Sequence, residues 1–483
     1  MKKYKIEITI FLAAFLISMI FLALLLIFNA DEITAGKGDY IQTAKNLVDF
    51  GVFSSLSGDP PAPDNWRTPV YILFLSFFLW LKIPLFAISV IQDIIFAASA
   101  VMVYSLGKRI FTERTAKISA LIFAVEPFGA FVSNMHQSEA IFLPFFIPAV
   151  FFILFYIKDY RPKYLYWFAV LTGISILIRP ILFYILFFEF FLVFIIAFFE
   201  KQKRIVILLK EMIFAFLLVI LIISPWFIRN KIHFGSFNNS SVSGSALYDY
   251  ALMFGDWLGD EEGVEEMQNQ IAESLKVFPL KWYLINPTVF ERNNNDLVVS
   301  LRDGGILKFS RGDIAAEVGK AGKIFIFKHP FKYMAYNFIF LPHLFYEDSY
   351  NDFVRLFVSL GGDRHFRGLS YYIVNLKFKE IPGQIKNNAL LISVGIVPKL
   401  FFALASFLAF CNLFLLKKYW RGDKYAAKII FFLAALLFLY AVLVSPAGIA
   451  RYRFPFNPFI FLLALNFIFF TLKKSREDKY LSR

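Results

Sequence analysis

Two carboxylates in this chain stand in short polar stretches between hydrophobic segments, and both stretches contain other groups that can do chemistry. Asp39 opens the sequence GDYIQTAKNLVDF, and Arg67 follows it after a loop rich in Gly, Ser, Pro and Asp. Glu139 ends the sequence NMHQSE, close to His136. A carboxylate can take a proton from a nucleophile, and arginine binds phosphate oxygens through two parallel hydrogen bonds. These residue types indicate a site for a phosphorylated substrate at a bilayer surface.

Asp39 has two interpretations. Apolar residues follow it at helical spacing: Tyr40, Ala44, Leu47 and Val48. Asp39 could cap this helix, a frequent role for aspartate. The partial positive charge of a helix N-terminus also favours an ionised carboxylate, which suits a general base or a metal ligand. The sequence leaves both interpretations open, and with them a role for a divalent cation.

Composition identifies the chain as a membrane protein. It has 483 residues, is 59% hydrophobic and has a mean hydropathy of +0.62, whereas soluble domains average about 45–50% apolar residues. The net charge is +14, but most Lys and Arg flank hydrophobic runs, where they set topology and meet anionic headgroups. We therefore expect membrane lipids as partners and no nucleic acid. The single cysteine, Cys411, excludes an internal disulfide framework.

Hydrophobic runs long enough to cross a bilayer occur along much of the chain. They lie at roughly 8–28, 83–106, 118–157, 164–199, 211–228, 389–416, 425–444 and 453–472. One crossing takes about 20 residues, so the third and fourth runs must turn back, at Asn134–Glu139 and at Arg179–Pro180. The run 69–81 is too short to cross and is expected to be re-entrant or interfacial. The sequence thus predicts an all-α polytopic membrane protein with about ten spans.

The distribution of charge orients these spans. If the lysine-rich N-terminus is inside, ten crossings also place the other basic clusters inside, at 108–117, 158–163, 201–210, 417–424 and 473–483. We expect a multi-pass protein of the cytoplasmic (inner) membrane with both termini in the cytoplasm. Its predicted parts are a transmembrane catalytic module at 1–228 with a first outer loop at 29–82, an extracytoplasmic segment at 229–388, C-terminal spans at 389–472 and a cytoplasmic tail at 473–483.

The extracytoplasmic segment is the least hydrophobic part of the chain. It begins with the polar stretch FGSFNNSSVSGS, which we expect to be flexible. The acidic patch Asp256–Glu266 is expected to be a solvated helix face, since its spacing lacks the EF-hand pattern of a calcium site. The later stretch KIFIFKHPFKYMAYNFIFLPHLFY alternates basic and aromatic groups, which is typical of a helix lying on a membrane.

Arginines at the outer ends of spans are unusual, because basic residues normally gather in cytoplasmic loops. Convergent guanidinium groups at one membrane face would suit a lipid phosphate or pyrophosphate. For any single arginine, contact with lipid headgroups is the alternative. By the predicted topology the set comprises Arg67, Arg179, Arg229, Arg451 and Arg453.

These residues also resemble the motifs of a known group, the GT-C superfamily of polytopic glycosyltransferases that use polyprenyl-phosphate sugars. The resemblance is strongest to its protein O-mannosyltransferase and aminoarabinose transferase branch. In that pattern an acid in the first outer loop precedes a small helix and a basic-x-Pro element, and a Ser-Glu pair lies in a second loop. The matching residues here are Asp39, Arg67-Thr68-Pro69, Ser138-Glu139, Arg179-Pro180, Pro225-Trp226 with Arg229-Asn230, and Arg451-Tyr452-Arg453 with Pro455.

The correspondence covers residues 1 to about 235 and the last spans, and it has two departures. Tyr40 follows Asp39 where aminoarabinose transferases have a second acid. The WWDYG-type signature of oligosaccharyltransferases is absent from the sequence. The first departure argues against aminoarabinose as the sugar, and the second against transfer of a whole glycan to asparagine.

The resemblance implies a GT-C type helical bundle with inverting glycosyltransferase activity. One sugar would move from a polyprenyl-phosphate carrier to a hydroxyl of a lipid, glycan or protein acceptor at the outer face. Asp39 would deprotonate or orient the acceptor, and Glu139 would contact sugar hydroxyls or a divalent ion. The implied substrate-binding residues are Arg67, His136, Arg179, Arg229, Arg451, Tyr452 and Arg453. Two other classes stay open: a lipid-linked glycan flippase or transporter, and a glycan polymerase or ligase.

Overall fold

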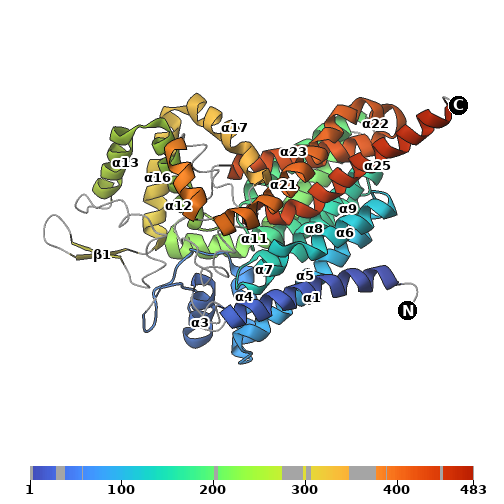
Figure 1. Ribbon diagram of the computed structural model, residues 1–483. Coiled ribbons are helices and arrows are strands. Elements are labelled where there is room, and N and C mark those ends of the chain that lie inside the picture. Colours follow the sequence, from blue (N-terminus) through green and yellow to red (C-terminus); the bar gives the residue numbers. More distant parts are fainter. Residues whose placement is uncertain are drawn as a thin grey trace.

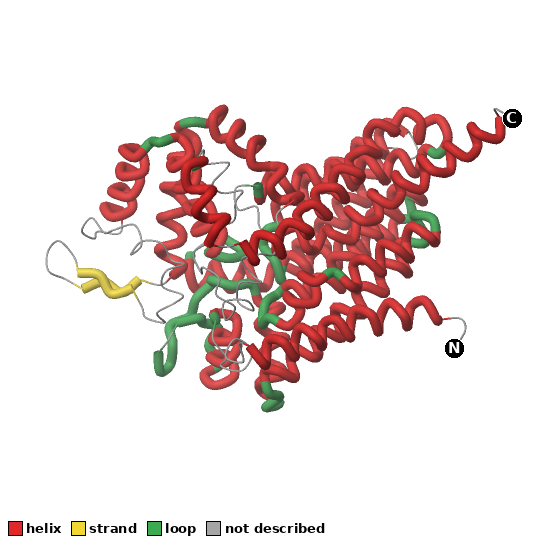
Figure 2. The backbone as a smooth tube through the Cα atoms, in the orientation of Figure 1, coloured by secondary structure: helices red, strands yellow, loops and turns green. Residues whose placement is uncertain are grey.

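The structure is a computed structural model, and it describes most of the chain. The described residues are 4–28, 38–56, 58–200, 205–235, 237–274, 297–300, 306–309, 311–346, 377–387, 389–445 and 450–481. Helices dominate these residues and form a long bundle with a smaller helical module at one end (Figure 1, Figure 2).

The first half of the chain supplies ten of the described helices. In order they are α1 (Lys5–Phe28), α3 (Asp39–Phe50), α4 (Pro69–Trp80), α5 (Leu85–Gly107), α6 (Glu113–Val125), α7 (Pro127–Asn134), α8 (Glu139–Asp159), α9 (Pro162–Ile176), α10 (Leu182–Glu200) and α11 (Ile205–Phe234).

The second half contains the end module and the last bundle helices. The module and the segment after it comprise α12 (Val242–Leu258), α13 (Glu261–Ser274), β1 (Leu297–Ser300), β2 (Ile306–Phe309), α16 (Arg311–Lys328), α17 (Pro330–Tyr346), η3 (Phe378–Glu380) and α20 (Ile381–Asn387). The two strands pair antiparallel, with Leu297 opposite Phe309. The bundle ends with α21 (Ala389–Cys411), η4 (Asn412–Leu415), α22 (Leu416–Gly422), α23 (Lys424–Val444), α24 (Ala450–Arg453), η5 (Phe454–Phe456) and α25 (Asn457–Leu481).

The prediction of an all-α polytopic membrane protein is confirmed. Among the described residues, eight helices are long and apolar enough to cross a membrane, or nine if the bent pair α6–α7 counts as one span. Both long hydrophobic runs turn back where expected, between α7 and α8 and between α9 and α10. The described helices thus fall one short of the ten expected spans, because the fifth, α9, has only 15 residues, fewer than the usual crossing length of about 20. Helix α4, with 12 residues, is also too short to cross, as predicted.

A bend between α6 and α7 directs the chain toward the second polar turn. The two helices meet at 52°, because Pro127 lacks the N–H that would continue the α6 hydrogen-bond ladder. The Glu126 carboxylate accepts hydrogen bonds from the backbone N–H groups of Phe128 (3.1 Å) and Gly129 (2.8 Å). This acidic residue within an apolar run thus caps α7.

The end module has its own apolar core, which includes Tyr248, Phe254, Val318, Phe325 and Tyr336. Helices α12 and α16 lie unusually close together there. A Cβ atom on Gly244 would be 2.1 Å from the carbonyl oxygen of Ala315, and one on Gly319 would be 2.6 Å from the Cα of Gly244. Glycine is needed at this crossing because any side chain would push the two backbones apart.

The polar residues just before α12 are packed and hydrogen-bonded, contrary to the expectation that this stretch is flexible. Asn239, Ser240 and Ser241 are all buried. The carbonyl of Asn239 accepts a hydrogen bond from Trp226 Nε1 at 2.7 Å, and the N–H of Ser241 donates to the carbonyl of Asn65 at 3.0 Å. Small polar side chains suit this segment because they satisfy buried backbone carbonyls: Ser240 Oγ donates to Trp66 and Asn239 Nδ2 to Ile176.

Candidate active site

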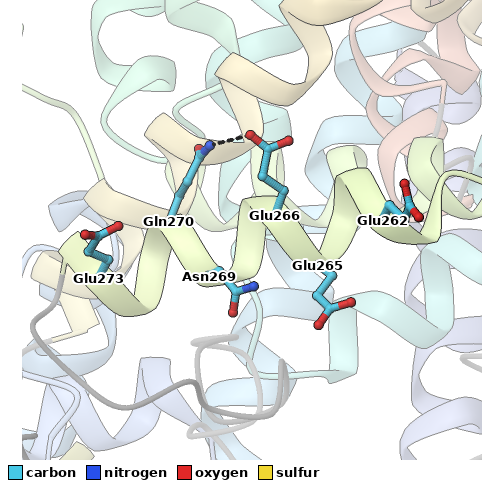
Figure 3. A pocket seen from close by; sticks show the side chains of 6 residues that line it. All are labelled: Glu262, Glu265, Glu266, Asn269, Gln270 and Glu273. Atoms are coloured by element: carbon cyan, nitrogen blue, oxygen red, sulfur yellow. Dashed lines mark hydrogen bonds between the residues drawn. The ribbon is translucent and has the colours of Figure 1, made fainter.

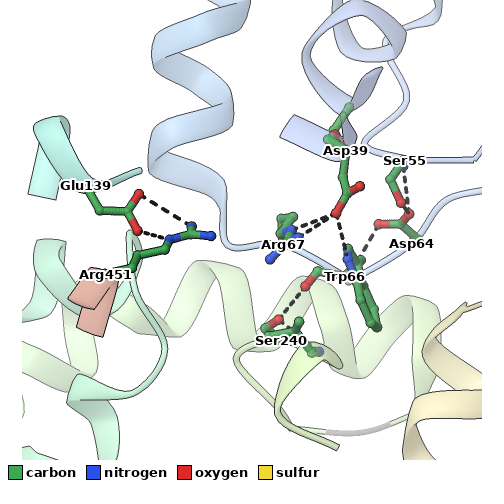
Figure 4. Close-up of polar contacts among 10 residues, drawn as sticks. Asp39, Ser55, Asp64, Trp66, Arg67, Glu139, Ser240 and Arg451 are labelled. Atoms are coloured by element: carbon green, nitrogen blue, oxygen red, sulfur yellow. Dashed lines mark hydrogen bonds and ion pairs between the residues drawn. The ribbon is translucent and has the colours of Figure 1, made fainter. Parts of the chain in front are cut away.

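Asp39 lies at the start of α3, and its carboxylate is bound by the loop that precedes α4. Its Oδ2 accepts three hydrogen bonds: from Trp66 Nε1 at 3.0 Å, from Arg67 Nε at 3.1 Å and from Arg67 Nη2 at 2.6 Å (Figure 4). The exposed fraction of the side chain is 8% for Asp39 and 21% for Arg67. Gly38 occupies the N-cap position of α3. The side chain of Asp39 is therefore directed to the loop, where two neighbouring residues fix its orientation.

Backbone and side-chain hydrogen bonds give this loop a defined shape. Asp64 accepts from the N–H of Ser55 (2.7 Å) and from the N–H of Trp66 (3.1 Å). Asn46 of α3 donates to the carbonyls of Ser54 and Leu56. The carbonyl of Trp66 accepts from Ser240 Oγ at 2.5 Å, and the indole is fully buried (Figure 4). Sequence reasoning did not identify Asp64 or Trp66; the loop's mixed Asp, Asn and Ser content was the only available signal.

Arg229 braces the same loop from α11. Its Nη1 donates to the carbonyl of Asp64 at 2.7 Å, and its Nη2 to the carbonyl of Phe53 at 3.4 Å. The guanidinium carbon lies 4.7 Å from the centre of the Trp226 ring. These contacts satisfy loop carbonyls, so the structure places Arg229 behind the loop that carries Trp66.

Glu139 is the first residue of α8 and is fully buried. Its Oε1 accepts from Arg179 Nη1 at 3.2 Å and from Arg451 Nε, and its Oε2 accepts from Arg451 Nη2 at 3.4 Å. Arg179 follows α9 and Arg451 begins the last span, so three distant parts of the sequence meet here. Two guanidinium groups on one carboxylate leave a net positive charge. The exposed fraction of the side chain is 27% for Arg451 and 8% for Arg179.

Two tyrosines connect the two carboxylate clusters. The Arg67 guanidinium carbon lies 4.6 Å from the centre of the Tyr40 ring, and that ring stands edge-on to Tyr71 at 5.0 Å. Tyr71 is fully buried, and its hydroxyl donates to Gln92 on the side of the Glu139 turn. Burial raises the pKa of the Tyr71 phenol well above its usual range, so the hydroxyl stays a neutral donor.

Gln92, a fully buried residue of α5, joins Tyr71 to the turn before Glu139. Its Oε1 accepts from the Tyr71 hydroxyl at 2.8 Å. Its Nε2 donates to the carbonyls of Ser133 (2.9 Å) and Met135 (3.0 Å). Both amide N–H groups and the amide oxygen of Gln92 thus hold α4 against the α7–α8 turn.

The remaining predicted binding residues occupy different places. The Tyr452 ring centre lies 5.8 Å from the Arg179 guanidinium carbon, beside the Glu139 cluster. His136 Nε2 is 3.1 Å from the carbonyl oxygen of Leu85, at the start of α5. Arg453 is buried, donates to the carbonyl of Leu344 at 3.0 Å and lies over the Phe402 ring at 3.7 Å. These contacts of Arg453 connect the last span to α17 and α21.

The described residues contain no group of three or more His, Cys, Asp or Glu side chains that could hold a metal ion. An open hollow of about 480 Å³ lies on α13 (Figure 3). Its lining side chains are all exposed, which agrees with the expected solvated acidic helix face: Glu262, Glu265, Glu266, Asn269, Gln270 and Glu273.

The described residues thus define a class: a polytopic membrane protein in which two arginine-bound carboxylates lie at one end of the bundle. Residues 66–228 match the family model of dolichyl-phosphate-mannose-protein mannosyltransferases. This match confirms the resemblance to the GT-C superfamily, and it indicates a membrane glycosyltransferase with a lipid-linked sugar donor. The matched segment covers about a third of the chain, including Arg67, Glu139 and Arg179. Comparison with curated proteins and with solved structures gave no match.

Proposed function

We propose that the chain transfers one sugar, with inversion, from a polyprenyl-phosphate carrier to an acceptor hydroxyl at the extracytoplasmic face of the cytoplasmic membrane. The main support is the pairing of Asp39 with Arg67 and of Glu139 with Arg451, bridged by Tyr40 and Tyr71. This arrangement offers a base for the acceptor and cations for a lipid phosphate, and Gln92 connects Tyr71 to the turn before Glu139.

The donor phosphate is assigned to Arg67 and Arg451. Both side chains are partly exposed, whereas Arg179 is buried against Glu139. As the glycosidic bond breaks, negative charge grows on the phosphate oxygen, and guanidinium groups bound to the phosphate stabilise that charge. Arg229 is assigned a supporting role, because it binds the carbonyls of the loop that carries Trp66.

In the proposed reaction the acceptor oxygen attacks the anomeric carbon on the face opposite the phosphate. The carbon–oxygen bond to the phosphate breaks, and polyprenyl phosphate leaves. Asp39 takes the proton of the acceptor hydroxyl. Arg67, which holds Asp39 before the donor binds, moves its hydrogen bonds to the phosphate and so releases the carboxylate to act as a base.

The topology remains part of the proposal. Basic clusters at the opposite ends of the spans from Asp39 and Glu139 support an extracytoplasmic site. A donor with a long apolar tail would reach such a site from within the membrane, which explains why the chemistry lies at the ends of spans.

The decisive experiment measures transfer of radiolabelled sugar from a synthetic polyprenyl monophosphate in detergent. Asp39→Asn is expected to lower turnover by about 10²- to 10⁴-fold, the usual contribution of a general base, while donor binding changes little. Asp49→Asn is the matched control, because Asp49 is exposed on the same helix.

The outcomes of this assay distinguish the proposal from its alternatives. Near-normal turnover by the Asp39→Asn variant would show that Asp39 is not the general base. Transfer by the wild-type protein in detergent, without a second compartment, would exclude transport as the primary activity. Transfer only from a lipid diphosphate would favour a glycan polymerase or ligase instead.

A further inference from the structure

An apolar stripe runs along the exposed sides of α16 and α17, away from the candidate active site. Its members are 45–80% exposed, which is high for large apolar side chains on consecutive helices. We define the stripe as Ile324, Phe327, Phe331, Met334, Phe338 and Ile339.

The opposite sides of these two helices are firmly packed. Phe325 of α16 and Tyr336 of α17 are buried in the core of the end module, and Leu344 and Phe345 are buried in the bundle core. Since α17 is fixed at both ends, the stripe is a stable surface of the fold and not a set of loose side chains.

The stripe continues directly into the lipid-facing surface of a span. Ser445, at the end of α23, donates to the backbone and side-chain oxygens of Asn337 at 3.1 and 3.0 Å. The Phe338 ring contacts Phe438 of α23 at 6.3 Å, and Phe438 is itself 43% exposed. Figure 1 shows α17 running from the end module to the bundle beside α23 and α21.

Positive charge accompanies the apolar side chains. Lys320, Lys323 and Lys332 are exposed on the same two helices, and the Lys323 ammonium lies 5.9 Å from the centre of the Phe327 ring. Aromatic and aliphatic side chains with lysines beside them are typical of a surface at the boundary between headgroups and acyl chains. A water-facing surface would not hold so many large apolar groups together.

We propose that this stripe is inserted into the lipid leaflet at the active-site end of the bundle, with Lys323 and Lys332 bound to anionic phospholipid headgroups. The occupant is lipid and not another protein, because the stripe is continuous with the lipid-facing surface of α23 and its flanking charge matches anionic headgroups. The attachment anchors the end module to the membrane.

The contact with α23 places the side chains of the stripe at different depths in the lipid leaflet. Phe438 is six residues before the last residue of α23, Val444, about 9 Å along the helix axis. Phe338, which contacts it, therefore lies deeper than Phe331, which is nearer the end-module end of α17. Phe327 follows Phe325 and Ile326, which belong to the core of the end module, so we expect it nearest the water. A peripheral contact with a protein partner would produce no such order.

The test uses single cysteines at positions 327, 331 and 338 in a Cys411→Ser background, each carrying a nitroxide spin label. The full-length protein is reconstituted in phosphatidylcholine vesicles. The ratio of collision with oxygen to collision with a water-soluble nickel chelate is expected to rise from 327 to 331 to 338. Glu265→Cys, on the exposed acidic face of α13, is the matched control and is expected to remain in water.

A second measurement adds phosphatidylglycerol to the vesicles. The label at position 331 is expected to move deeper, and Lys323→Gln with Lys332→Gln is expected to abolish that shift. Labels at 331 and 338 as accessible to the nickel chelate as the α13 control would overturn lipid insertion. An unchanged depth with phosphatidylglycerol would overturn the role of the lysines. Both readouts are independent of sugar transfer.

Discussion

At the scale of single residues, the site consists of carboxylates whose positions are fixed by guanidinium groups and one indole. Glu139 receives hydrogen bonds from two arginines, and Asp39 from Arg67 and Trp66. Charge-assisted hydrogen bonds of this kind are short and strongly directional. The residues with partly exposed side chains, Arg67 and Arg451, are those to which the donor phosphate is assigned.

Replacement of Arg451 by lysine tests the contact that its guanidinium group makes through two nitrogen atoms, Nε and Nη2. Lysine keeps the charge but cannot bind a carboxylate and a phosphate through a planar fork. Loss of one charge-assisted hydrogen bond costs about 1.5–3 kcal/mol, so kcat/KM for the donor is expected to fall about 10- to 100-fold. Arg421→Lys, at an exposed position on α22, is the control. An unchanged kcat/KM for Arg451→Lys would show that Arg451 does not bind the donor phosphate.

Replacement of Trp66 by phenylalanine tests the role of the indole N–H group. The change keeps an aromatic ring in the buried position but removes the N–H that binds Asp39 at 3.0 Å. We expect kcat at saturating donor to fall about 10-fold, as for one hydrogen bond to a charged group. Trp80→Phe, at an exposed position on α4, should have no effect. Equal kcat values for the two variants would contradict the role of Trp66.

At the scale of elements, the site depends on short pieces of chain held by hydrogen bonds to longer helices. The loop before α4 is bound by α3, by Arg229 of α11 and by the segment before α12. The α7–α8 turn is bound by Gln92 of α5. Because Gln92 also binds Tyr71, one buried amide couples both carboxylate clusters.

Replacement of Gln92 by leucine should loosen both clusters together. It removes the partner of the Tyr71 hydroxyl and of the Ser133 carbonyl, at about 1–3 kcal/mol for each buried unsatisfied group. The Met135 carbonyl keeps its hydrogen bond from the N–H of Gln137. We expect a lower melting temperature and, in the folded fraction, a fall in kcat larger than the rise in KM. Ser99→Ala is the control, because this buried α5 residue bonds only within its own helix. A lower melting temperature with unchanged kcat would show that Gln92 is structural alone.

At the scale of the whole molecule, the candidate active site and a second cluster of buried charges lie at opposite ends of the bundle. Glu139 begins α8 at the active-site end. At the opposite end, Glu200 accepts from the Tyr160 hydroxyl at 2.6 Å and from Lys428 Nζ at 2.5 Å. The 21 residues of α8 set the two ends about 30 Å apart. This second cluster joins α8, α10 and α23.

Replacement of Lys428 by methionine should therefore destabilise the protein without altering its reaction. Removal of one partner leaves Glu200 with an unpaired charge that is only 12% exposed. Breaking a buried pair costs about 3–5 kcal/mol, and we expect a lower melting temperature in detergent. The kcat of the folded fraction should match wild type. Lys424→Met, exposed at the start of the same helix, is the control, and a changed kcat would contradict the separation.

The hydrophobic pattern alone determined the class of protein and most of its helices. Bilayer thickness fixes the length of a span, so both turns in the long runs could be placed from length, including the one before Glu139. The exception is α9, whose apolar run suggested a span that its 15 helical residues do not complete. Local signals also singled out Asp39, Arg67, Glu139 and the other arginines as candidates, because basic residues at the outer ends of spans are few.

The tertiary structure decided which of these residues meet. No pattern of spacing indicates that Arg451 pairs with Glu139 while Arg453, two residues later, binds the carbonyl of Leu344. Nor does a pattern indicate that Arg229 binds loop carbonyls, or that a polar stretch rich in serine is buried against Trp66. Helix formation depends on neighbours three or four residues apart, which the sequence displays directly. Side-chain partners more than 300 residues apart depend on how the helices pack, and only the folded bundle specifies that packing.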